Sequence, residues 1–282
     1  MAILSIQSAV AYGHVGNSAA VFPLQRLGHE VWPIDTVQLS NHTGYGAWRG
    51  RAWGANDIAE VVRGIDERGA LKRCEAVLSG YLGEAALGDA VLDGVARVKS
   101  ANPQALYCCD PVIGDDHSGV FVRPGIVDFF RDRAIPAADI VTPNRFELAL
   151  LTGATVADMK DAVAATAILR ARGPRLVLVT SLPAAEDEIA MMAASGDGAW
   201  LVTTPRLPIV ANGAGDLAAA LFLGFYLRGR DPAAALEQTA AAVFAIIEAT
   251  FRAGEGELQI VAAQEAMTSP PRRFGSTCIA CP

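Results

Sequence analysis

Apolar and polar segments alternate along most of the chain, and their periods predict alternating strands and helices. Short apolar runs predict strands at 2–5, 29–38, 76–82, 106–112, 140–142 and 176–180, and a hairpin of 189–194 with 199–203. Longer runs predict helices at 17–27, after Asp57, and at 84–100, 144–151, 156–171, 215–227, 232–249 and 257–267. Asn17 is expected to cap the first helix. This alternation predicts an α/β fold of three layers, with a mainly parallel central sheet flanked by helices on both faces.

The predicted elements run without a linker or repeat, so we expect one domain over 1–268 and a flexible C-terminal tail over 269–282. The tail contains Cys278 and Cys281 in a C-x-x-C spacing, which is half of a zinc site at best. The remaining cysteines lie in or beside apolar strands and are expected in the core.

Composition excludes several classes of partner. With 282 residues, 52% of them hydrophobic and 19% charged, the chain has the make-up of a compact soluble protein. Its formal net charge of −7 gives no reason to expect nucleic acid or an anionic membrane surface as a partner. No apolar run reaches the roughly 18 residues of a membrane span. No positive charge precedes Arg26, so the N-terminus does not resemble a signal peptide, and we expect a cytoplasmic protein.

Polar clusters follow many of the predicted strands, at 5–8, 41–45, 79–81, 110–114, 142–147 and 212–216. In open α/β sheets, ligands bind outside the carboxyl ends of the strands. The convergence of these clusters on that edge predicts a binding site there.

The segment from Asn212 to Asp216 is the clearest candidate for chemistry. Gly213, Ala214 and Gly215 form a turn ahead of an apolar helix, so backbone N–H groups and the helix dipole favour an anion. Asp216 adds a carboxylate that can accept a proton, and we expect the helix N-terminus to lower its pKa. An anion site beside a base is what phosphoryl transfer to an alcohol requires. Asp216 as a plain helix cap remains the alternative on these residues alone.

The two commonest phosphate-binding motifs are missing. Neither a Walker A loop nor a dinucleotide-binding G-x-G-x-x-G is present.

Several motifs together resemble a known family. The glycine–Asp helix start, Asp110-Pro-Val-Ile-Gly114 and Thr142-Pro-Asn-Arg-Phe-Glu147 resemble the ribokinase-like superfamily. Within it, the segments 5–8, 16–17, 36–38, 40–45 and 78–81 are similar to pyridoxal kinases of the bacterial salvage type, and Asn41-His-Thr-Gly-Tyr45 is the most specific of them. The resemblance spans about residues 3–266.

The resemblance implies an ATP-dependent kinase that phosphorylates the 5′-hydroxymethyl of pyridoxal, with pyridoxine and pyridoxamine left open as acceptors. Asp216 would be the base, and the backbone of Gly213–Gly215 would hold the phosphoryl group. Residues lining the pyridoxal pocket would be Ser8, Thr43, Gly44 and Tyr81, together with Asp216. Asp110 and Glu147 would hold Mg²⁺. Nucleotide contacts would come from Asp110, Thr142, Asn144, Glu147, Thr180, Thr204, Pro205, Arg206 and Leu207. The resemblance also implies a homodimer and leaves a monovalent cation such as K⁺ open.

The sequence departs from this family at two points. Relatives of this kind carry Lys where Thr180 or Ser181 stands, and Thr or Val where Ala214 stands. Arg145 or Arg206 is a candidate for the missing positive charge. Asn144 and Glu147 also fit a helix capping box. Two alternatives to the kinase stay open: a pyridoxal or pyridoxal-phosphate binding protein without turnover, and a related hydroxymethylpyrimidine kinase, in which Cys usually replaces Asp216.

Overall fold

The computed structural model describes residues 2–280 and is built on one ten-stranded sheet. The strand order is β12-β11-β10-β9-β8-β5-β4-β1-β2-β3. Its parallel centre consists of β1 (Ala2–Val10), β2 (Glu30–Leu39), β4 (Cys74–Ser79), β5 (Leu106–Cys109), β8 (Ile140–Val141) and β9 (Leu176–Pro183). Antiparallel strands extend both ends: β3 (Gly50–Ala52) beside β2, and β10 (Glu188–Ser195), β11 (Gly198–Pro205) and β12 (Thr277–Ala280) beyond β9. A separate small sheet pairs β6 (Gly114–Asp115) with β7 (Gly119–Val120).

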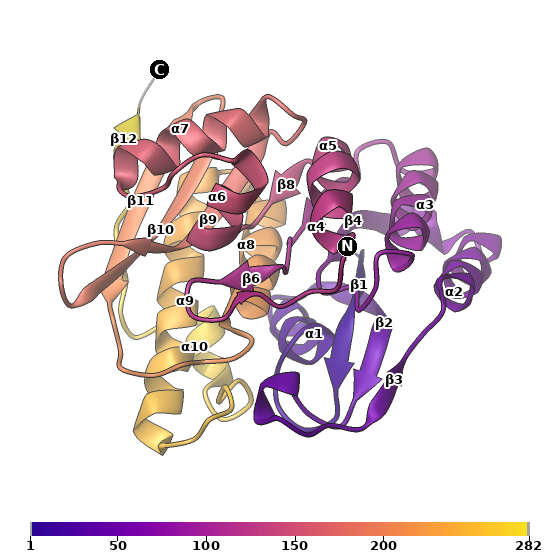
Figure 1. The fold of residues 1–282 in the computed structure, drawn as a ribbon, viewed down its shortest axis with the longest axis horizontal. Helices are drawn as coiled ribbons and strands as arrows, with labels where there is room; N and C mark the ends of the chain where they lie inside the picture. The colour runs from indigo at the N-terminus through magenta and orange to yellow at the C-terminus, as the bar shows by residue number, and fades with distance from the viewer. Residues whose placement is uncertain (1, 281–282) are drawn as a thin grey trace.

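Helices cover both faces of the sheet, which confirms the predicted three-layer α/β fold (Figure 1). One face carries α2 (Ala55–Glu67), α3 (Leu87–Ala101), α4 (Ile126–Phe129), α5 (Ile135–Ala137), α6 (Arg145–Thr152) and α7 (Met159–Arg170). The other carries α1 (Asn17–Arg26), α8 (Ala214–Gly229), α9 (Pro232–Ala253) and α10 (Gln264–Thr268). Short 3₁₀ turns occur at Thr43–Tyr45 and Ala70–Arg73, and a π turn at Phe130–Ala134 joins α4 to α5.

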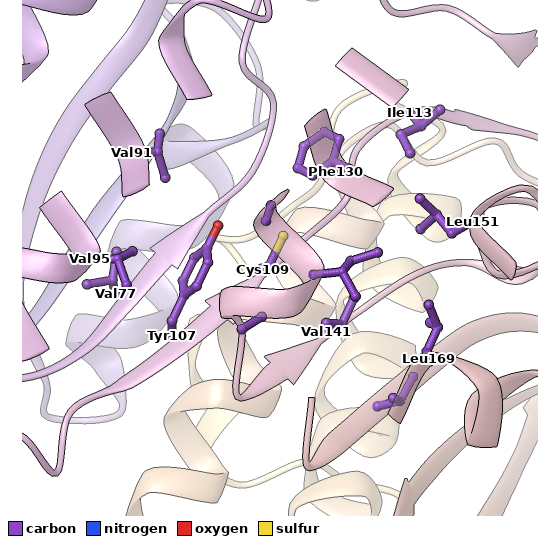
Figure 2. Close-up of a cluster of buried hydrophobic side chains, with 14 of the residues drawn as sticks. Val77, Val91, Val95, Tyr107, Cys109, Ile113, Phe130, Val141, Leu151 and Leu169 are labelled. Carbon is purple, nitrogen blue, oxygen red and sulfur yellow. The ribbon is translucent and has the colours of Figure 1, made fainter. Parts of the chain in front are cut away.

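Each face of the sheet has its own hydrophobic core, because side chains of successive strand residues point to opposite faces. Figure 2 shows part of one core, where Tyr107 and Cys109 of β5 lie among side chains from neighbouring strands and helices. The Tyr107 hydroxyl is fully buried and shares a hydrogen bond of 2.8 Å with Ser79 Oγ. A buried phenol keeps its polar end satisfied in this way.

The apolar helix α8 is enclosed on nearly every side. Residues 217–225 are all buried, and the helix packs between α1 and α9. This enclosure fixes the position of its N-terminus, where the glycine turn and Asp216 stand. Helix α9 is long and apolar enough to span a membrane by length and composition, but 61% of the relevant window is buried inside the protein, as expected of a core helix.

The structure differs from the sequence prediction in several elements. Strand β1 extends to Val10, and Gly16 rather than Asn17 occupies the N-cap of α1. The helical segments between 126 and 137 and the β6–β7 pair have no counterpart in the prediction.

The segment expected as a flexible tail contains β12, which pairs antiparallel with β11. Its short alternation was too weak to predict a strand without knowledge of the open edge of β11. Cys281 lies outside the described residues.

Candidate active site

The glycine turn forms the N-terminus of α8. Gly213 is the N-cap residue and adopts a left-handed conformation with φ of 82°, and a side chain there would collide with the carbonyl of His14. Glycine is therefore required by both conformation and space. Within residues 2–280, the N–H groups of Gly213 and Gly215 have no hydrogen-bond acceptor, whereas Ala214 donates to the Ala211 carbonyl over 3.3 Å. Two of the three expected donors are thus available to an anion.

Asp216 lies in the first turn of α8, directly behind these donors. The N–H groups of Gly16 and of Asp216 itself lie near this carboxylate and favour its charged form. Burial nevertheless raises its pKa to about 6, because removing the charge from water outweighs the two donors. The expectation that the helix N-terminus lowers this pKa is wrong, and the carboxylate is a stronger base than an exposed Asp.

Asp110 follows β5 and is 5% exposed. Thr142, at the end of the neighbouring β8, donates from Oγ1 to Asp110 Oδ1 over 2.9 Å. Burial raises the pKa of Asp110 well above its usual range, and the charges of Asp216 and Glu147 raise it further. Two carboxylates predicted from separate motifs therefore lie close enough to Asp110, at the carboxyl edge of the sheet, for their charges to act on it.

Glu147 is held by backbone donors. Its Oε1 accepts from the N–H of Ile113 (2.8 Å) and of Gly114 (3.3 Å), and its Oε2 accepts from the N–H of Asn144 (2.9 Å). Burial raises its pKa to about 8 against the opposing effect of these three bonds. Asn144 caps α6 through the reciprocal bond to the Glu147 N–H, and its Nδ2 donates to the Gly114 carbonyl. The capping box is thus formed, and it also fixes the loop after Asp110.

The residues expected to bind pyridoxal lie on three segments at the same edge. Ser8 is buried in β1, and Gly16 packs directly against it. Thr43 and Gly44 lie in the exposed turn that follows β2. Tyr81 follows β4, and its carbonyl accepts a hydrogen bond of 2.7 Å from Thr36 Oγ1.

The residues expected to contact the nucleotide fall on the neighbouring strand ends. Thr180 is buried in β9 and donates its N–H to the Pro143 carbonyl. Thr204 and Pro205 end β11, which runs in the same direction as β9 because β10 is antiparallel to both. Arg206 and Leu207 follow at once, and the Arg206 Nε donates to the Glu188 carbonyl. Arg145 pairs with Asp116, so its charge is already matched, and Arg206 is the better candidate for a cation near the nucleotide.

Comparison with known proteins gives a consistent result. The family model for phosphomethylpyrimidine kinase matches residues 69–261. The chain is 59% identical to pyridoxal kinase PdxY of Rubrobacter xylanophilus, over 96% of this chain and 95% of that protein. It is 53% identical to pyridoxal kinase PdxY of Corynebacterium diphtheriae, over 97% and 98%. The chain belongs to the pyridoxal kinase family.

The pyridoxal kinase fold accounts for the whole structure. The pyridoxal kinase of Leishmania donovani, solved in complex with ADP and pyridoxamine, superposes with a TM-score of 0.93 at 28% identity and covers 100% of this chain and 99% of that one.

Two residues near Asp216 play parts that the sequence did not indicate, because Gly16 was given no role and Asn17 was expected only to cap the first helix. The N–H of Gly16 lies near the Asp216 carboxylate and favours its charged form, and the φ of 54° and the contact with Ser8 exclude a side chain on Gly16. The neighbouring Asn17 is buried, accepts from Ser5 Oγ, and donates from Nδ2 to the Ile34 carbonyl and to Asp35 Oδ1. The Gly16-Asn17 pair is visible in sequence, but its link to a residue 200 positions later is not.

Proposed function

We propose that this chain transfers the γ-phosphoryl group of ATP to the 5′-hydroxymethyl of pyridoxal, giving pyridoxal 5′-phosphate for vitamin B6 salvage. The observation that carries this proposal is the start of α8, where the carboxylate of Asp216 stands behind the N–H groups of Gly213 and Gly215, which have no acceptor in the described part of the chain. The family membership supports the same activity, since its members are named for it.

Asp216 acts as the base that orients or deprotonates the acceptor hydroxyl. A pKa of about 6 leaves it mostly ionised at neutral pH while making it a better proton acceptor than an ordinary Asp. The N–H groups of Gly213 and Gly215 stabilise the charge on the transferred group. The acceptor is held by Ser8, Thr43, Gly44 and Tyr81. The nucleotide is contacted by Thr142, Thr180 and the segment 204–207.

Mg²⁺ fits the carboxylate arrangement at Asp110. The charges of Asp216 and Glu147 raise the pKa of Asp110, so a cation bound at Asp110 would relieve their repulsion, and carboxylate oxygen is the ligand type that Mg²⁺ prefers. When bound, Mg²⁺ would neutralise phosphate charge. Among residues 2–280, no three His, Cys, Asp or Glu side chains form a complete metal-binding group, so water and phosphate oxygens would supply the remaining ligands. Glu147 is engaged by three N–H donors and would act through water or by fixing the 113–114 loop.

The other parts of the proposal concern assembly and location. We infer a homodimer that covers the site, in a cytoplasmic enzyme whose partners are pyridoxal and ATP rather than nucleic acid or membrane.

The experiment that tests the function is formation of pyridoxal 5′-phosphate from pyridoxal and Mg·ATP, with Asp216→Asn as the control. We expect product from the parent and a fall in kcat of about 10²–10⁴ in the variant, because the base is lost while the amide keeps its shape. Equal activity of the two proteins would show that Asp216 is not the base.

A second candidate is phosphorylation of a hydroxymethylpyrimidine, which the family model for phosphomethylpyrimidine kinase favours. The same assay with that acceptor measures the ratio of the two kcat/KM values. Binding of pyridoxal without any product from either acceptor would favour a binding protein.

A further inference from the structure

The turn that carries Thr43 and Gly44 has few contacts of its own. Residues 43–50 are exposed, and the turn is held internally by bonds such as Gly44 N–H to His42 Nδ1 and Asn41 Nδ2 to the Ala47 carbonyl. Figure 1 shows this indigo turn beside the yellow segment that follows α9, although more than 200 residues separate them in sequence. We call residues 40–46 the acceptor loop.

Glu257 joins these two segments. It is 9% exposed, and its Oε1 accepts a short hydrogen bond from the Tyr45 hydroxyl of the acceptor loop. Its Oε2 accepts from the N–H of His14 over 2.9 Å. Within the described chain, Glu257 has no ion-pair partner at all, so two neutral donors satisfy this buried carboxylate. A side chain on Gly13 would collide with the carboxylate, so the backbone at Gly13 can pass this close to Glu257 only because the residue is glycine.

The groups that face Glu257 favour these bonds. The hydrogen bond to Glu257 raises the Tyr45 pKa to about 12, so the phenol stays protonated and donates. Burial lowers the pKa values of His14 and His42, and the charge of Glu257 opposes that effect in both. Tyr12 lies against Tyr45 with ring centroids 6.4 Å apart.

The segment containing His14 reaches the catalytic turn. The His14 carbonyl packs on Gly213, and the N–H of Gly16, two residues later, acts on the Asp216 carboxylate. A single buried carboxylate therefore connects the acceptor loop to the segment that holds the proposed base.

We propose that Glu257 is a positioning residue: through Tyr45 it holds the acceptor loop closed against residues 12–16, and so sets the affinity for the acceptor alcohol. The inference rests on the proposed function, because it assigns the acceptor to this loop. If Glu257 served only to anchor the segment after α9, its loss would change stability and not acceptor affinity.

The test compares Tyr45→Phe, Glu257→Gln and the double variant, with Tyr12→Phe as the matched control. Tyr45→Phe removes only the donor. An amide at 257 has one oxygen, which must face the His14 N–H because a backbone N–H can only donate, so Glu257→Gln removes the carboxylate oxygen that accepts from Tyr45. Since hydrogen bonds to a charged group are among the stronger ones, we expect each single variant to raise KM for pyridoxal about tenfold. KM for ATP should stay within about twofold, and Tyr12→Phe should match the parent because its hydroxyl makes no hydrogen bond within the described chain.

The double variant should be no worse than Glu257→Gln, because both changes break the same bond. Additive losses in KM, or an unchanged KM in Tyr45→Phe, would overturn the proposal. So would a lower unfolding temperature in Glu257→Gln with KM for pyridoxal unchanged.

Hydrogen exchange separates this inference from the function on which it rests. In the protein without substrates, the amides of the acceptor loop should exchange faster in Tyr45→Phe and Glu257→Gln than in the parent. If no B6 vitamer is phosphorylated by the parent, the proposed function fails, and the exchange rates still decide whether Glu257 closes the loop. Unchanged exchange in both variants would refute the closure.

Discussion

At the scale of single residues, burial decides the chemistry of the site more than sequence neighbours do. Asp216 follows a helix start that should lower its pKa, yet its loss of water contact raises the pKa to about 6. Asp110 shows the same effect, reinforced by the charges of Asp216 and Glu147. Burying carboxylates near one another lowers the stability of the fold unless a cation or a substrate balances their charge. Such an arrangement is typical of a functional site.

The raised pKa of Asp216 predicts the pH dependence of the enzyme. The base is active when ionised, so kcat/KM for pyridoxal should rise about tenfold per pH unit below pH 6 and level off above it. Steady-state rates from pH 5 to 8 with saturating Mg·ATP measure this, with Asp216→Asn as the reference for residual activity. A rate that stays constant between pH 5 and 7 would contradict the assignment.

At the scale of elements, the site depends on how α1 and α8 meet. The two helices pack against each other, and the N–H of Gly16 at the start of α1 acts on the Asp216 carboxylate at the start of α8. Asn17 fixes the start of α1 by tying it to β1 through Ser5 and to β2 through Ile34 and Asp35. The buried amide is therefore a structural support for the catalytic carboxylate.

Asn17→Ala tests this support. We expect a loss of about 2 kcal/mol or more in stability, because buried partners lose their hydrogen bonds, and a fall in kcat of about tenfold as Gly16 shifts. Asp231→Ala is the matched control: its side chain caps α9 through the N–H groups of Ala233 and Ala234, and its removal should cost about 1 kcal/mol. Urea unfolding and initial rates on both variants measure the two effects. A fall in kcat of the same size in Asp231→Ala would mean that lost stability alone explains the result.

At the scale of the whole molecule, the centre and the edges of the sheet have different roles. The parallel centre carries the proposed chemistry at its carboxyl edge, while β12 covers the edge of β11. Ser276 anchors the approach to β12 through two hydrogen bonds of 2.7 Å to Glu237 Oε1, from its N–H and its Oγ. The C-terminal segment is thus part of the fold and distant in the sheet from β1, β4 and β5.

Truncation after Ser276 should therefore separate stability from activity. Removing β12 should lower stability by about 1 kcal/mol, or about 3 °C in unfolding temperature, and raise aggregation because β11 gains an unpaired edge. We expect kcat and both KM values to stay within about twofold of the parent. Thermal unfolding, light scattering and initial rates measure these effects, and a large loss of turnover would place the C-terminal segment in the site.

The sequence by itself determined the alternation of strands and helices, and hence the three-layer fold, because apolar periodicity depends only on local geometry. It also located the glycine turn, Asp216, Asp110 and the Asn144–Glu147 pair, because each lies within a contiguous motif that ends a strand or begins a helix.

Only the tertiary structure decided the features that join distant segments. The approach of the Gly16 N–H to Asp216 and the hydrogen bond from the Tyr45 hydroxyl to Glu257 each join residues about 200 positions apart. The raised pKa of Asp216 likewise comes from burial, and the strand character of 277–280 comes from the free edge of β11. These properties depend on which surfaces meet after the chain has folded, and local sequence patterns do not specify which surfaces meet.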